Sequence, residues 1–443
     1  MKNELRSIVE DRNKGRSIQM HGRLISWPPE FKSGDEWVAH IIQYYGSDLM
    51  SAYEDLVKWP GAFSVVVRDY QEPGKNPIVH MFTDMLGQDQ LYFTILELGK
   101  SRNDVVVAPT VRELAEFLGC EEPDALYMAS VAKFGYHIGC RTYAPGVYRA
   151  KPLAITTVDP NTVRVSYTHG KLNKMLLPPS EHLSFSDTLL ISFERNVIWR
   201  AQRGELDEGL TVLVSGGLDS SVMAHLVMDN VRAGGPLSRI PLQFLTIVNG
   251  EDAGYANMLA EAEGFDLEFL PAPDEEGEYL EQAITAADSP IDLGSLIPNF
   301  RLIAAAKHRH ILTGDGPDEL LGGYARMKDY DSQQSDIFHE LSYYHLPKLN
   351  QTASWFNKTL ICPYLDPAMI AFALYLPLES RTNKRILKEF ARGMLPCAII
   401  DRDKFALKSG LVRKDKVAHR MKCLDLFRKI FFQNSDHDEN TES

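Results

Sequence analysis

Short runs of β-branched and aromatic residues, separated by turn residues, occupy the first 180 positions. Six such runs are GAFSVVVRDY, NPIVHMFTD, QLYFTIL, DVVVAPT, GVYRAKP and AITTV, each bounded by Gly, Pro, Asn or Asp. Runs of this kind predict strands joined by turns. We therefore predict a mainly β domain over residues 1–180. The segment 171–185, which contains a Pro-Pro pair, is interpreted as the surface connection that follows it.

A different pattern begins at Phe185, where apolar residues recur at helical spacing. Alternation of strand and helix is typical of βαβ units, so we predict an α/β domain with a parallel sheet over residues 181–432. Beyond Tyr324 this domain is predicted to be helical to about Phe432, and residues 433–443 form a disordered acidic tail. The predicted strands are 209–215, 241–248, 267–273 and 309–314, and the helices between them are 221–231, 256–265 and 299–308.

The composition of the chain argues against several classes of protein. A chain of 443 residues is too long for a single hydrophobic core and fits two or three domains. Its content of 44% hydrophobic and 24% charged residues is ordinary for a globular protein. The net charge of -13 argues against a broad nucleic-acid-binding surface. No apolar run approaches the length of a membrane span, and the polar N-terminus lacks a signal-peptide core. Five scattered cysteines fit a reducing compartment, so we expect a cytosolic protein.

The strongest chemical signal is the turn in VLVSGGLDSS, residues 212–221, between a buried strand and the start of a helix. Glycines let backbone N–H groups approach phosphate oxygens, the helix N-terminus supplies positive potential, and serine hydroxyls donate further hydrogen bonds. Asp219 suits such a turn as a Mg²⁺ ligand. The ending of a Walker A loop is absent, which disfavours transfer of a γ-phosphoryl group. The candidate nucleotide-binding residues are Ser215, Gly216, Gly217, Asp219, Ser220 and Ser221.

A second acidic, glycine-rich turn, ILTGDGPDELLGGY at residues 311–324, follows the fourth predicted strand. The carboxyl ends of neighbouring strands in an open parallel sheet meet in one place, so both turns are expected to face one nucleotide.

Together, SGGLDSS and TGDGPDELLGGY resemble the paired motifs of the asparagine synthetase family, within the N-type ATP-pyrophosphatase superfamily. Relatives include β-lactam synthetase, carbapenam synthetase and lasso-peptide cyclases. The resemblance implies ATP as substrate, Mg²⁺ held by Asp219 and Asp318, and an adenylate contacted by Thr313 and Gly314. It also implies that Val214 and Thr246 line the nucleotide pocket.

The resemblance has one departure within the second motif. Where asparagine synthetase has glutamate in S-G-E-G, this chain has Asp315, which is shorter by one methylene. In the family that glutamate supports formation of the aspartyl adenylate and approach of the nitrogen nucleophile. Asp315 is therefore a candidate catalytic residue, and it leaves the acyl substrate open.

Three later segments extend the resemblance. ICPYLD at 361–366 is similar to V-P-F-L-D, and KRILK at 384–388 is similar to K-x-I-L-R. Arg402-Asp403-Lys404 matches an R-x-K motif that supplies a lysine to the adenylation site. A fixed cation there stabilises the charge that develops at the α-phosphate. Lys404 is the candidate catalytic lysine, and Lys408 is its competitor.

Residues from about Trp37 to Pro152 resemble the N-terminal glutaminase (Ntn-type) domain of asparagine synthetase. GAFSVV at 61–66 matches G-x-F-A-x-x, and DMLGQDQLY at 84–92 matches D-x-x-G-x-x-P-L-Y. That glutaminase uses a cysteine exposed at the N-terminus, and position two is Lys2. We therefore expect a degenerate glutaminase-like domain that hydrolyses no glutamine.

Three functions fit these features. The first is an amide ligase of asparagine synthetase type, which adenylates aspartate or an aspartate-like carboxylate and takes nitrogen from ammonia, an amine or a separate glutaminase. The second is a cyclase that forms a lactam or macrolactam within one substrate, and the third is a non-catalytic nucleotide-binding protein. Expected partners are a small-molecule or peptide carboxylate and possible second copies of the chain, with no nucleic acid and no membrane.

Overall fold

The computed structural model describes residues 6–11, 15–24, 27–28, 30–72, 74–97, 103–176, 183–248, 252–271, 279–290, 295–324, 336–402 and 416–432. Lys404, Lys408, the predicted boundary at residue 180 and the predicted tail 433–443 lie outside these residues. The predicted division into domains therefore stays a prediction.

Two antiparallel sheets make up the N-terminal part of the chain. The larger sheet has the order β1-β2-β3-β4-β8-β9, and the smaller has the order β6-β5-β7. All six predicted strands are present, but β1, β2 and β9 were not predicted. Strand β2 was missed because buried polar residues, Ser17 and His21, dilute its apolar alternation. The bounds are β1 Arg6–Asp11, β2 Arg16–Leu24, β3 Gly61–Asp69, β4 Ile78–Thr83, β5 Tyr92–Glu97, β6 Asn103–Ala108, β7 Tyr148–Arg149, β8 Ala154–Asp159 and β9 Arg164–His169.

The described residues of the N-terminal part also contain five helices, although the sequence predicted mainly strands there. Ser33 and Asp48 accept backbone N–H groups at the starts of the first two helices, and Thr110 and Asp124 do the same for the next two. These caps were available in the sequence as signals for helix starts. The helices are α1 Gly34–Tyr45, α2 Leu49–Leu56, α3 Val111–Leu118, α4 Ala125–Phe134 and α5 Leu172–Met175.

A five-stranded parallel sheet with the order β12-β11-β10-β13-β14 forms the centre of the C-terminal part. Its first four strands in the chain confirm the predicted parallel sheet. The fifth, β14, corrects the prediction that only helices follow Tyr324. Its three residues, Thr-Leu-Ile, are too few to show a periodic pattern. The bounds are β10 Leu210–Leu213, β11 Leu242–Ile247, β12 Leu267–Leu270, β13 His310–Leu312 and β14 Thr359–Ile361.

The strand order reverses between β10 and β13. The chain runs outward from β10 through β11 to β12, then returns to the other side of β10 as β13 and continues to β14. We call the carboxyl ends of β10 and β13 the switch point, because ligands of open parallel sheets bind where the order reverses.

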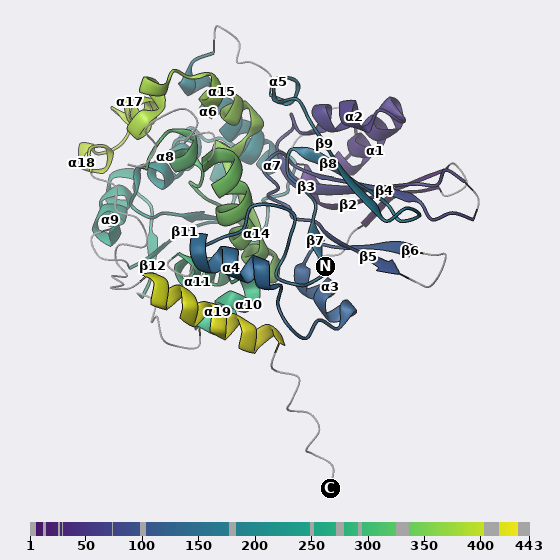
Figure 1. Ribbon diagram of the computed structural model, residues 1–443. Coiled ribbons are helices and arrows are strands. Elements are labelled where there is room, and N and C mark those ends of the chain that lie inside the picture. Colours follow the sequence, from purple (N-terminus) through teal and green to yellow (C-terminus); the bar gives the residue numbers. More distant parts are fainter. Residues whose placement is uncertain are drawn as a thin grey trace.

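Helices surround the parallel sheet, which lies to the left of the antiparallel sheets in Figure 1. A large hydrophobic cluster joins strands β2 and β3 to β10, α8 and α15. The helices of this part are α6 Phe185–Phe193, α7 Trp199–Gln202, α8 Leu218–Arg232, α9 Asp252–Glu263, α10 Tyr279–Ala287, α11 Leu296–Ala305, α12 Pro317–Leu320, α14 Leu346–Trp355, α15 Pro367–Tyr375, α16 Leu378–Arg381, α17 Arg385–Ala391, α18 Cys397–Ile400 and α19 Lys416–Phe432. Shorter or π-helical turns are η2 Glu194–Ile198, η3 Pro236–Arg239, η4 Asp336–His345, η5 Pro363–Leu365 and η6 Thr382–Lys384.

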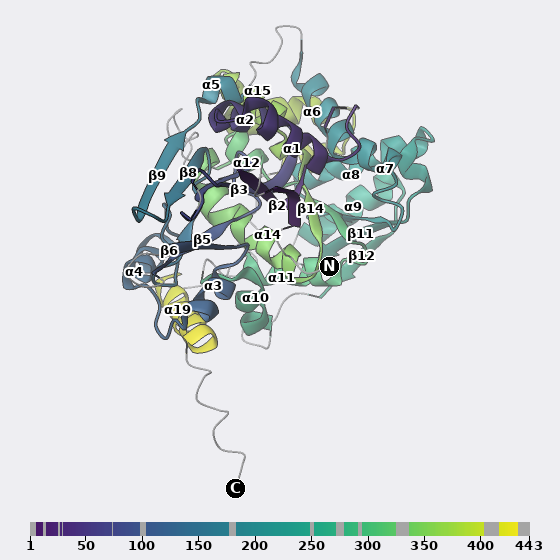
Figure 2. The same ribbon diagram turned by 90° about the vertical axis from the view of Figure 1, so that its right-hand side faces the viewer.

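Polar contacts, some of them buried, join the two parts of the chain. Asp288, just after α10, accepts the backbone N–H groups of Val111 and Arg112 at the start of α3 and the hydroxyl of Tyr143 at 2.6 Å. Arg420 of α19 donates to the carbonyls of Ala132 and Lys133 at the end of α4. The last helix therefore lies across both parts, as the yellow α19 shows in Figure 1 and Figure 2.

Among the residues that the structure describes, no helix combines the length and the apolarity that crossing a bilayer requires.

Candidate active site

The SGGLDSS turn lies directly between β10 and α8. Gly217 is the N-cap of α8 and provides no side-chain acceptor, so the first N–H groups of the helix receive no side-chain cap. Ser220 Oγ instead holds the turn, accepting from Ser215 N at 3.0 Å and donating to the carbonyl of Gly217. A helix start whose backbone N–H groups have no side-chain acceptor is suited to bind an anion.

The second turn lies against the first. Gly314 follows β13, and a Cβ atom built on it would lie 2.7 Å from the backbone nitrogen of Ser220. Only glycine fits at this distance. Gly216 is equally constrained, because its φ is +73° and a Cβ atom there would collide with the carbonyl of Asp252. The structure therefore brings the two predicted motifs into backbone contact at the switch point.

Asp219 and Asp318, the predicted metal ligands, converge on one cation. The Nζ atom of Lys384 lies 2.5 Å from Asp219 Oδ2 and 2.5 Å from Asp318 Oδ1. Burial alone would lower the pKa of Lys384, but the two carboxylates outweigh burial and raise that pKa above its usual range. The carboxylates thus point at a common centre of positive charge, and this donor set fits a divalent cation that also takes phosphate oxygens.

Lys384 reaches this position through an unusual backbone. Asn383 and Lys384 have φ values of 57° and 55°, in the left-handed region that few non-glycine residues adopt. The N–H groups of both residues donate to the second motif, to the carbonyls of Gly322 and Leu321, each at 2.9 Å. Gly323 leaves space for the lysine, since a Cβ atom there would lie 2.5 Å from Lys384 Cε. The LLGG sequence therefore positions Lys384.

Strand β14 adds the ICPYLD segment to the same region. The Cys362 thiol lies 3.1 Å from the Thr313 hydroxyl, and the Tyr364 hydroxyl donates to the backbone carbonyl of Asp219 at 3.3 Å. Asp366 is buried and caps α15 by accepting from the N–H of Ala368. The segment thus supports the two turns from one side, and its aspartate has a structural role.

Arg402, the arginine of the R-x-K segment, holds the SGGLDSS turn from the other side. Its guanidinium donates to the carbonyl of Gly216 at 2.9 Å, pairs with Asp252 and stacks over the ring of Tyr255. Lys404 and Lys408 lie outside the described residues, so their predicted roles stay predictions.

The remaining predicted residues lie at the same end of the sheet. Val214 continues β10, donates its N–H to the carbonyl of Leu245 and is buried, as is Thr246 near the end of β11. Ser221 is buried in the first turn of α8. Asp315 is half-buried in the second turn.

Two residues of this constellation were not predicted individually. Lys384 and Arg402 lie within motifs that carry the family resemblance, but the sequence predicts no separate role for either residue. Their signal in the sequence was the K-x-I-L and R-x-K resemblance alone, because nothing local distinguishes them from solvated charges.

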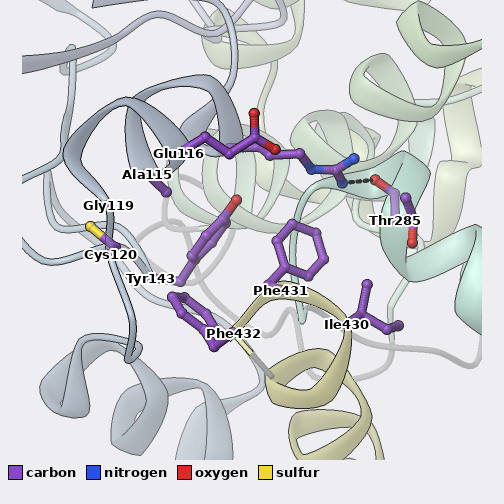
Figure 3. Close-up of a pocket in the computed structure, with 10 residues that line it drawn as sticks. Ala115, Glu116, Gly119, Cys120, Tyr143, Thr285, Ile430, Phe431 and Phe432 are labelled. Carbon is purple, nitrogen blue, oxygen red and sulfur yellow. Dashed lines mark hydrogen bonds between the residues drawn. The ribbon is translucent and has the colours of Figure 1, made fainter. Parts of the chain in front are cut away.

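A separate cavity of about 290 Å³ lies between α3, α10 and α19. Figure 3 shows the rings of Tyr143, Phe431 and Phe432 around it, with Cys120 at one side. Its arginine, Arg112, donates to the carbonyl of Thr285 at 2.5 Å. None of its lining residues belongs to the two motifs, and it lies where the two parts of the chain meet.

Comparison with known proteins places these features in a family. The family model described as asparagine synthase matches residues 201–361 and 331–436, which together span more than half of the chain. The match includes both motifs, Lys384 and Arg402.

Curated relatives are distant. A putative asparagine synthetase 1 (glutamine-hydrolyzing) of Methanocaldococcus jannaschii is 26% identical over 214 residues, 45% of this chain and 38% of that protein. An asparagine synthetase (glutamine-hydrolyzing) of Brassica oleracea is 25% identical over 386 residues, 78% of this chain and 61% of that protein. Amidase chyE of Penicillium rubens is 24% identical over 325 residues, which are 69% of this chain and 44% of that protein. The chain thus spans less than two thirds of the length of these relatives, and on the family match it belongs to the asparagine synthase family.

Proposed function

We propose that this protein is an ATP-dependent ligase that adenylates a carboxylate and transfers the acyl group to a nitrogen nucleophile, releasing AMP and pyrophosphate. The observation that carries the proposal is the convergence of Asp219 and Asp318, from two turns, on one point beside the uncapped start of α8. Membership of the asparagine synthase family supports the same chemistry.

Each part of the switch point has a role in this proposal. The N–H groups at the start of α8, with Ser215 and Ser220, bind the phosphates of ATP. Asp219 and Asp318 would hold Mg²⁺, which would supply positive charge to the pyrophosphate. Lys384 then contributes a second positive charge to the leaving pyrophosphate, and Thr313 and Gly314 border the adenylate.

We further propose that the N-terminal part is a glutaminase-like domain that supplies no nitrogen. Its two antiparallel sheets and the GAFSVV and DMLGQDQLY motifs support the domain type. Burial raises the pKa of the Cys120 thiol, whose Sγ contacts the carbonyl of Pro145, so this cysteine is not set up as a nucleophile. The nitrogen then comes from ammonia or from an amine.

The test is ATP–pyrophosphate exchange by the full-length protein across a panel of carboxylates. The panel includes aspartate, aspartate-like acids and amino-acid derivatives that carry their own amine. We expect exchange with one class of acid and AMP formation when ammonium chloride is added. Conversion of a single amine-bearing substrate without ammonium chloride would instead identify a cyclase, and exchange with no member of the panel would refute adenylation. Glutamate release from added glutamine would refute the external source of nitrogen.

A further inference from the structure

The cavity of about 290 Å³ between α3, α10 and α19 has no role in the proposed function. Its lining comes from both parts of the chain, because Cys120 follows α3, Thr285 belongs to α10, and Phe431 and Phe432 end α19. Small-molecule sites occupy about 300–1,000 Å³ and often lie where domains meet, so this cavity has the size for a ligand with one ring. A molecule bound here would contact both parts of the chain.

Aromatic rings form one side of the cavity. The ring centres of Phe431 and Phe432 lie 5.5 Å and 6.2 Å from that of Tyr143, with interplanar angles of 70° and 87°. Figure 3 shows these rings below the side chain of Glu116. Ile430 adds an aliphatic side chain to the same lining. Rings packed edge to face offer faces and edges to a further apolar group, which favours a ligand with an aromatic or branched apolar part.

Arg112, in the first turn of α3, brings a positive charge to the cavity. Within the part of the chain that the structure describes, its guanidinium makes one hydrogen bond, to the carbonyl of Thr285, and its Cζ lies 4.6 Å from the ring centre of Phe431. The carboxylate of Asp288 lies 3.8 Å from its Nε and already accepts the hydroxyl of Tyr143 and two backbone N–H groups. A guanidinium has five N–H donors in a fork that matches a carboxylate, so Arg112 can bind a further anion.

Glu116 supplies the opposite charge one turn further along α3. Residues four positions apart lie on the same face of a helix, and Arg112 and Glu116 both line the cavity. Glu116 is exposed, and its carboxylate forms no ion pair with any residue that the structure describes. The cavity therefore offers one cation and one anion beside an apolar lining.

We propose that this cavity binds a free α-amino acid with an aromatic or branched apolar side chain. The carboxylate of the ligand pairs with Arg112, its ammonium group pairs with Glu116, and its side chain packs on the rings of Tyr143, Phe431 and Phe432. A zwitterion matches both charges of the cavity, whereas an apolar acid matches only Arg112 and an apolar amine matches only Glu116. None of the lining residues belongs to the two motifs, so this ligand is additional to the proposed substrates.

Calorimetric titration of the full-length protein with L-phenylalanine and L-leucine tests the inference. 3-Phenylpropionate lacks the ammonium group and phenethylamine lacks the carboxylate, so each serves as a half-ligand. We expect saturable binding of L-phenylalanine or L-leucine, and affinities about tenfold lower for both half-ligands, because each loses one charged contact. Saturable binding of neither amino acid overturns the inference.

Two variants place the ligand in the cavity. Glu116→Gln changes an exposed side chain, and we expect it to weaken L-phenylalanine binding about tenfold while 3-phenylpropionate binds as before. Arg112→Lys keeps the charge without the planar fork and should weaken the binding of both ligands. Glu122→Gln, exposed and outside the cavity lining, is the matched control. L-Phenylalanine binding that is unchanged in Glu116→Gln and Arg112→Lys overturns the inference, because the amino acid then binds elsewhere.

Cys120 gives a readout that is independent of activity. Its side chain lines the cavity, whereas Cys397 is exposed at the start of α18. At an L-phenylalanine concentration about ten times its Kd, alkylation of Cys120 by iodoacetamide should slow about tenfold, with the rate at Cys397 unchanged. Equal alkylation of Cys120 with and without the ligand overturns the inference. Absence of pyrophosphate exchange with every carboxylate would refute the proposed function and leave this site standing, because the site uses neither motif.

Discussion

Both parts of the molecule have aspartates in turns, buried at Asp84 and half-buried at Asp219 and Asp318, but the partners of these aspartates differ. In the N-terminal part, Asp84 follows β4 and accepts four backbone N–H groups. Their nitrogens lie 3.0 to 3.3 Å from its oxygens. Three of these groups belong to its own turn, Leu86, Gln88 and Asp89, and the fourth is Phe63 of the adjacent strand.

In the C-terminal part, Asp219 and Asp318 come from separate turns and share the side chain of Lys384, which is 165 positions after Asp219. Backbone donors cannot leave Asp84 without unfolding its turn, whereas a lysine side chain can exchange for another cation or for a phosphate. The comparison teaches that backbone N–H partners fix Asp84 in its turn, whereas a side-chain partner leaves Asp219 and Asp318 able to exchange it.

The largest expected effect comes from Asp219→Asn, which keeps the shape of the side chain and removes its charge. We expect pyrophosphate exchange to fall about 1000-fold, because the amide cannot hold the cation that neutralises the pyrophosphate. Asp229→Asn, on the same helix with a side chain that is 70% exposed, is the control and keeps its activity. Exchange by Asp219→Asn within tenfold of wild type would contradict the assignment.

Asp84→Ala tests the other side of the comparison. Four backbone N–H groups lose their acceptor, so the free energy of unfolding should fall by about 3 kcal/mol. Urea unfolding measures this loss, with the exposed Asp104→Ala as control. Exchange per folded molecule should stay unchanged, and a selective loss of exchange in stable Asp84→Ala protein would show that this turn also serves catalysis.

Lys384→Met removes the shared cation and leaves two facing carboxylates. We expect exchange to fall about 30-fold through the loss of one positive charge at the pyrophosphate. MgCl₂ should raise the Tm of this variant more than that of wild type, because Mg²⁺ then supplies the missing charge. Arg385→Met, whose side chain is 68% exposed, should respond to MgCl₂ as wild type does. An equal response in both proteins would argue against a cation site between Asp219 and Asp318.

Arg402→Gln should have the smallest effect, about a tenfold rise in the KM for ATP, because it displaces a phosphate-binding turn without removing a charge from the carboxylate pair. Arg402→Lys should recover little, since lysine cannot span the Gly216 carbonyl and Asp252 with one planar group. Arg392→Gln, at an exposed position, is the control. An unchanged KM in Arg402→Gln would indicate that the turn holds its shape without this arginine.

Much of the parallel sheet was predictable because its signals are local. Strands β10, β11, β12 and β13 are apolar runs followed by turns, and the residues from Val212 to Ser221 carry strand, glycine turn and helix start within ten positions. Strand β14 was not predicted because it is too short to show a periodic pattern. Strand β2 was not predicted because its buried positions include polar residues.

The sequence by itself therefore determined the parallel sheet, the two acidic turns and their family, since each depends on neighbouring residues. Only the tertiary structure decided that Lys384 pairs with Asp219 and Asp318 and that Arg402 donates to the carbonyl of Gly216. The physical reason is that the residues next to a charged side chain do not indicate which distant residue it pairs with. The charge meets its partner only when strands β10, β13 and β14 pair in one sheet, which brings the turns that follow them together.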